Sequence, residues 1–139
     1  MTSIYDLYQT DLEKEVEGFW YSITPDVSFL LARAGGANTK FTQALEKKTR
    51  PHRQRGGAFS DDNVTDVELA MSVMKEAFAE TVILDWKGVT DVTGKKVAYS
   101  SASAIKLFND LPDLFTELRD AAAKQANFRM EEIEEDIKN

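Results

Sequence analysis

Two adjacent glycines, Gly35 and Gly36, follow a short apolar run and constrain how the first half of this chain folds. Because glycine adopts positive φ without steric cost, the pair predicts a tight turn between a strand ending near Arg33 and a helix beginning near Thr39. A phosphate-binding loop would need more widely spaced glycines and a Lys-Ser/Thr pair at the helix start. Here Lys40 follows Thr39 in the opposite order. The pattern therefore favours a strand-turn-helix joint that does not bind phosphate.

The length and composition predict one soluble globular domain. The chain has 139 residues, of which 42% are hydrophobic, and this is enough for one buried core. We expect the domain to cover residues 1–127, with a flexible loop near residues 54–61 and an acidic, amphipathic segment over residues 128–139. The first residues lack the features of a secretory signal, and no apolar stretch is long enough to span a bilayer. We expect a cytoplasmic protein.

The counts of reactive residues restrict the chemistry. The chain has no cysteine, which excludes disulfides, thiolate metal ligands and cysteine nucleophiles. Its single histidine, His52, lies among arginines, which repel a metal ion. We therefore expect no catalytic residue, no metal and no cofactor, so the chain is not expected to be an enzyme. The net charge of −7 argues against binding to nucleic acid or to an anionic membrane.

Hydrophobic patterns predict a mainly helical α+β fold, with an N-terminal β-hairpin packed on about four helices. The hairpin is expected over residues 18–23 and 27–33, with a turn at residues 24–26. Residues 89–99 are expected to form a small second hairpin or an extended loop. Pro51 is expected to end the first helix by Arg50. The helices are expected near residues 39–49, 64–86, 100–109 and 113–127.

Three features are candidates for partner binding. Aromatic side chains alternate along the first strand, so that two share one face of the hairpin and the third takes the other. Residues 40–55 hold six basic residues and one acidic residue, a local charge of +5. Apolar residues recur at helical spacing in the acidic C-terminal segment. The alternative is that the aromatics are buried in the core and the charges face water. The candidate residues are Phe19, Trp20, Tyr21, Arg50, Arg53, Arg55, Met130, Ile133 and Ile137.

Several short strings occur together in an order that resembles the tail assembly chaperones of long-tailed bacteriophages and prophages. The resemblance covers roughly residue 18 to the end of the chain. The strings are Arg33-Ala34-Gly35-Gly36-Ala37-Asn38 with Phe41, Leu45-Glu46, Thr49-Arg50-Pro51 with Arg53, Ala79-Glu80-Thr81-Val82-Ile83, Trp86-Lys87-Gly88-Val89-Thr90-Asp91 with Gly94-Lys95, Leu111-Pro112-Asp113-Leu114-Phe115 and Asp136-Ile137-Lys138-Asn139.

The resemblance implies a non-enzymatic protein that forms homo-oligomers and coats the tape measure protein in the host cytoplasm. It would keep that protein soluble, help to recruit tail tube protein, through a longer frameshifted form in many such phages, and be absent from the mature virion. Attraction between the basic block and the acidic C-terminal segment would let copies associate head to tail. One alternative is a virion structural or head-tail connector protein. Another is nucleic-acid binding through residues 40–55, although Phe41 is the only aromatic residue there.

Overall fold

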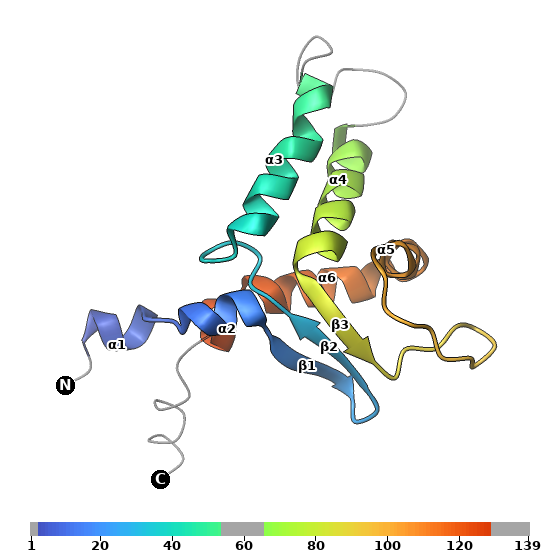
Figure 1. Ribbon diagram of the computed structural model, residues 1–139, viewed down its shortest axis with the longest axis horizontal. Helices are drawn as coiled ribbons and strands as arrows, with labels where there is room; N and C mark the ends of the chain where they lie inside the picture. Colours follow the sequence, from blue (N-terminus) through green and yellow to red (C-terminus); the bar gives the residue numbers. More distant parts are fainter. Residues whose placement is uncertain (1–2, 54–65, 129–139) are drawn as a thin grey trace.

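The computed structural model describes residues 3–53 and 66–128, and it confirms the predicted mainly helical α+β class (Figure 1). A three-stranded sheet lies at the centre, and α3 and α4 extend away from it side by side. The elements in chain order are α1 (Ile4–Tyr8), α2 (Leu12–Glu17), β1 (Phe19–Thr24), β2 (Val27–Leu31), α3 (Thr39–Arg53), α4 (Asp66–Thr81), β3 (Ile83–Lys87), α5 (Ser101–Asp110), α6 (Pro112–Ala123) and the 3-10 helix η1 (Gln125–Phe128).

The sheet is antiparallel with the order β1-β2-β3, and its first two strands are the predicted hairpin. Tyr21, Phe29 and Trp86 lie opposite one another across the three strands on the face that packs against the helices. β2 ends at Leu31 rather than Arg33. The reason is that the Arg33 N–H leaves the strand ladder and donates to the Glu15 carbonyl.

The third strand was not predicted, because residues 64–86 were expected to be one helix. α4 instead ends at Thr81, and β3 pairs with β2. Ile83 and Trp86 are both buried and stand three residues apart, a spacing that also fits a helix. A register shift between Leu30 and Leu31 produces this spacing, and long-range pairing overrides the local pattern.

The first long helix also differs from the prediction, since α3 continues through Pro51 to Arg53. Pro51 lacks an N–H and its ring crowds the carbonyl of Lys47. Both residues are exposed in the last turns of the helix, where water can satisfy that carbonyl. α3 packs along α4, and Lys48 Nζ lies 3.0 Å from a Glu80 carboxylate oxygen.

The C-terminal elements follow the sequence signals closely. Ser100 caps α5 in a reciprocal pair of hydrogen bonds with Ser103, and Pro112 occupies the first turn of α6 as expected. α6 ends at Ala123 rather than Asn127, and the chain continues into η1, where Phe128 is buried against Phe19. The two short helices α1 and α2 were not predicted.

Residues 89–99 form an extended loop with one isolated bridge between Thr90 and Lys96. The Trp86 indole N–H donates to the Val97 carbonyl at 2.8 Å and holds this loop against β3. The predicted flexible loop and most of the acidic C-terminal segment, residues 129–139, lie outside the described residues.

The predicted strand-turn-helix joint is present, with φ of 122° at Gly35 and 55° at Gly36. The space beside Gly36 is filled by the Glu15 carboxylate. The buried Asn38 side chain donates to the carbonyls of Arg33 and Thr81, so it ties the joint to the end of α4.

Candidate partner-binding surfaces

The sheet face opposite the helices carries exposed apolar side chains. Trp20 on β1 pairs in register with Leu30 on β2, and Leu84 on β3 lies beside the register shift. Trp20 is 40% exposed and Leu84 is 38% exposed. We call this surface the open sheet face and define it by Trp20, Ser22, Ser28, Leu30, Leu84, Asp85 and Lys87.

Charged residues on β3 border this apolar area. Lys87 Nζ lies 4.1 Å from the centroid of the Trp20 ring, which places the cation over the aromatic face. The hydroxyls of Ser22 and Ser28 lie 3.1 Å apart beside them. The open sheet face therefore offers an apolar area with polar groups at one side, as protein interfaces do.

The two other aromatics of the hairpin face inward. Phe19 packs edge-on against Phe128, with ring centroids 5.1 Å apart, and Tyr21 packs against the core. The sequence pattern placed Trp20 opposite Phe19 and Tyr21, and the structure confirms this alternation. The open sheet face thus receives one of the three candidate aromatics.

The basic candidates are only partly described. Arg50 is exposed on α3 and lies 3.6 Å from the Glu46 carboxylate one turn earlier. Arg53 ends α3, and the structure describes its backbone but not its side chain. The remaining candidates lie outside the described residues, and they are Arg55, Met130, Ile133 and Ile137.

A second apolar surface lies at the N-terminus, where α1 projects to one side of the molecule and α2 lies against the body (Figure 1). We call residues 4–16 the N-terminal arm. Ser3 and Asp6 form a capping box that fixes the first turn of α1. The arm carries exposed large apolar side chains, among them Ile4, Tyr5, Tyr8, Leu12 and Val16.

The arm is anchored to the body through Glu15, which is 1% exposed. Its carboxylate accepts hydrogen bonds from Arg33 Nη1 at 2.8 Å, from the Thr10 hydroxyl at 2.5 Å and from the Ala37 N–H at 3.1 Å. Burial alone would raise the pKa of Glu15, but these hydrogen bonds outweigh burial and lower the pKa below its usual value of 4.5. The ionised carboxylate therefore holds α2 against the joint.

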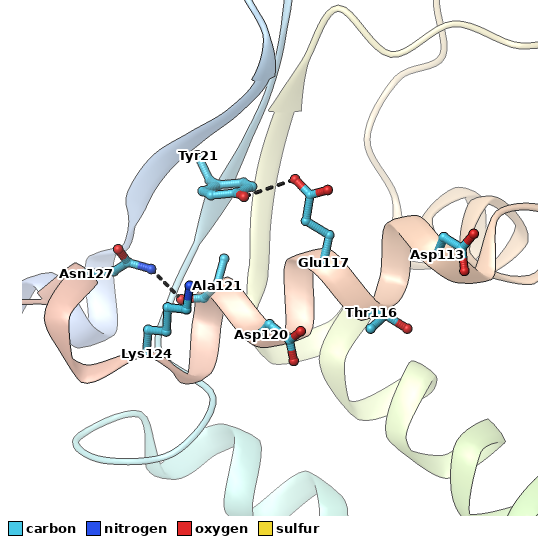
Figure 2. Close-up of a pocket in the computed structure, with 8 residues that line it drawn as sticks. All are labelled: Tyr21, Asp113, Thr116, Glu117, Asp120, Ala121, Lys124 and Asn127. Atoms are coloured by element: carbon cyan, nitrogen blue, oxygen red, sulfur yellow. Dashed lines mark hydrogen bonds between the residues drawn. The ribbon is translucent and has the colours of Figure 1, made fainter.

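A polar pocket of about 430 Å³ lies between β1 and α6 (Figure 2). The Tyr21 hydroxyl donates to Glu117 Oε2 at 3.0 Å, and this hydrogen bond raises the pKa of Tyr21. Asp113, Glu117 and Asp120 line one side of the pocket on α6, with Lys124 beside them. The arrangement makes this face of α6 acidic.

Among the described residues, no group of three or more His, Cys, Asp and Glu side chains is placed to hold a metal ion. Across the same part of the chain, every helix is too short or too polar to cross a membrane.

A family model described as YdaY prophage protein matches residues 36–139, which is more than half of the chain. The chain belongs to the YdaY prophage protein family. It is therefore a prophage-associated protein. None of the curated proteins matches this YdaY family member, and none of the solved structures does.

The family match begins at the strand-turn-helix joint, so the N-terminal arm and the hairpin of this YdaY family member precede the matched region. Sequence reasoning did not include the arm among the candidate sites. A signal was present, because Ile4 and Tyr8 stand one helical turn apart directly after Ser3, a residue type that caps helices.

Proposed function

We propose that this prophage protein is a phage tail assembly chaperone that coats the tape measure protein through its open sheet face. The observation that carries the proposal is the exposed apolar area around Trp20 and Leu84. Exposed apolar patches rimmed by polar residues are typical of protein-binding sites. The resemblance over residues 18–139 and membership of a prophage family agree with this function.

An amphipathic helix of the tape measure protein would lie with its apolar side on this face. Trp20 supplies a broad ring, which Lys87 stabilises, and Leu30 and Leu84 supply aliphatic contacts beside it. Such contacts depend on apolar side chains at helical spacing rather than on one exact sequence. This lack of sequence dependence would suit the coating of a long helical partner at many positions.

We further propose that the protein acts in the host cytoplasm before the tail tube polymerises, and that it acts by binding rather than by catalysis. It would help to bring tail tube protein to the coated tape measure protein, and it would leave before the virion is complete.

Co-expression with the tape measure protein of the same prophage tests the proposed contact. We expect the wild-type chain to keep the tape measure protein in the soluble fraction. The double variant Trp20→Ser and Leu84→Ser should lose most of this effect, because both side chains are on the open sheet face. Val92→Ser is the matched control, since Val92 is fully exposed on the loop after β3.

An unchanged soluble yield with the double variant would contradict the assigned face. Mass spectrometry of purified particles separates the chaperone from a virion structural or connector protein. We expect the chain to be missing from particles whose tails are complete. Its presence there at a fixed ratio to the tail proteins would replace the proposal with the structural alternative.

A further inference from the structure

The N-terminal arm exposes large apolar side chains, and its first helix, α1, has only five residues. Ile4 is 67% exposed and Tyr8 is 65% exposed, and the two stand one turn apart in α1. Helices much shorter than about 12 residues are marginal in water unless they are packed against another surface. The arm is therefore suited to insertion into an apolar site.

A matching site lies beside the turn that joins β1 and β2. We call it the apolar groove and define it by Ile23, Val27, Val89, Leu107, Leu111 and Leu114. Phe29 is buried beneath it, and Leu111 on its rim is 49% exposed. Its walls come from both strands of the hairpin, from the loop after β3 and from the junction between α5 and α6.

The size and chemistry of the groove favour side chains of a polypeptide over a small molecule. Its volume is about 270 Å³, near the lower limit of the roughly 300–1,000 Å³ of typical small-molecule sites. Among the described residues that line it, Thr90 alone has a polar side chain. A small ligand would lack the several polar groups that normally fix its orientation, whereas apolar side chains need none.

The arm and the groove lie at opposite ends of the long axis of the molecule (Figure 1). α1 is at one end, while the turn between β1 and β2, α5 and the loop after β3 all lie toward the other. In the described conformation, the arm of one molecule cannot reach its own groove. Both unfilled surfaces can be buried together when they belong to different copies.

We propose that the N-terminal arm of one copy docks in the apolar groove of the next copy, with Ile4 and Tyr8 as the inserted side chains. The contact joins two different surfaces, so each added copy leaves one arm and one groove unoccupied. The proposal rests on the proposed function in one respect, because it specifies how a coating protein would contact its own copies.

Sedimentation velocity of the full chain over a range of concentrations tests this contact. The wild type should form species larger than a dimer as its concentration rises. Leu111→Arg and the double variant Ile4→Ser with Tyr8→Ser should each weaken association roughly 30-fold or more, as the loss of central interface residues does. Val92→Ser should associate as the wild type does. Thermal melting followed by circular dichroism checks that each variant folds, and Leu111→Ser replaces Leu111→Arg if the charge unfolds the protein.

Mixing the two defective variants gives the decisive measurement. The Leu111→Arg copy keeps its arm, and the arm variant keeps its groove. An equimolar mixture should therefore form a one-to-one dimer and nothing larger. A mixture that stays monomeric, or a groove variant that associates normally, would overturn the proposal.

This outcome is separate from the test of the proposed function. Neither variant changes the open sheet face, so the soluble yield of the tape measure protein reports on that face independently. A strictly monomeric wild type that still solubilises the tape measure protein would remove the arm contact and leave the chaperone proposal standing.

Discussion

Glu15 holds three parts of the chain at one point. Its carboxylate binds Thr10 in the arm, Arg33 after β2 and the Ala37 N–H before α3. Gly36 lies against this carboxylate with a positive φ of 55°. The joint therefore requires both a residue without a Cβ and an acid that arrives from a distant part of the sequence.

We expect Gly36→Ala to destabilise the fold more than Gly94→Ala. Both glycines have positive φ, which costs about 1–3 kcal/mol for a residue with a side chain. An added Cβ at Gly36 would also overlap Glu15, whereas nothing lies within 4 Å at Gly94. Urea unfolding of the two variants measures the difference, and equal losses of stability would contradict this account.

Glu15→Gln should reduce the free energy of unfolding at pH 7 by about 2–3 kcal/mol, because it removes the charge that Arg33 faces. The pKa of Glu15 is lowered in the folded state, so its contribution is present above the usual value of 4.5 and is lost as the pH falls. The stability gap between wild type and variant should thus stay constant from pH 7 down to about pH 4.5 and shrink as the pH falls further. Denaturant titrations at several pH values test this. A gap that stays constant throughout would show that ionisation of Glu15 does not matter.

At the scale of elements, Tyr99 contacts both sides of the junction between α4 and β3. The Tyr99 hydroxyl lies 2.5 Å from the Ala79 carbonyl and 2.6 Å from the Ile83 carbonyl, so it can donate to either. Burial and the charge of Asp85 raise the pKa of Tyr99, so the hydroxyl stays protonated as a donor. This contact lies where the helix ends and the strand begins.

Tyr99→Phe should lower stability by about 1–3 kcal/mol, because it removes a donor from the carbonyls of two buried residues. Tyr21→Phe is the matched control. Its hydroxyl donates to an exposed glutamate, so its loss should cost less than about 1 kcal/mol. Thermal unfolding of both variants gives the comparison, and the reverse order would contradict the role assigned to Tyr99.

The elements that could be predicted are those with local causes. The glycine pair predicted the joint, alternating aromatics predicted which face of the hairpin Trp20 takes, and serine and proline signals placed the starts of α5 and α6. β3 could not be predicted, because pairing with a distant strand determines it. The apolar groove could not be predicted either, since its walls come from four parts of the chain that only the fold brings together.

At the scale of the whole molecule, charge opposes association and apolar contact favours it. Each copy carries a net charge of −7, so copies repel one another at low ionic strength. The proposed contact between arm and groove is apolar, so it would become stronger when salt screens this repulsion. An interface built on the basic block and the acidic C-terminal segment would instead be weakened by salt.

Raising the salt concentration from about 0.05 M to about 0.5 M should therefore strengthen self-association. Light scattering across this range measures the mean mass at constant protein concentration. The Leu111→Arg variant serves as the control and should stay small throughout. A mean mass that falls as salt is added would favour the charge-based interface.

Because the arm and the groove lie at opposite ends, the proposed contact does not by itself fix the number of copies in an assembly. A ring or a two-fold pair fixes its own number of subunits, but a chain of such contacts has no internal stop. The number of copies in a row would then be dictated by the extent of whatever polypeptide they line up on. A longer template would simply hold more of them, without any change in the sequence of the subunit.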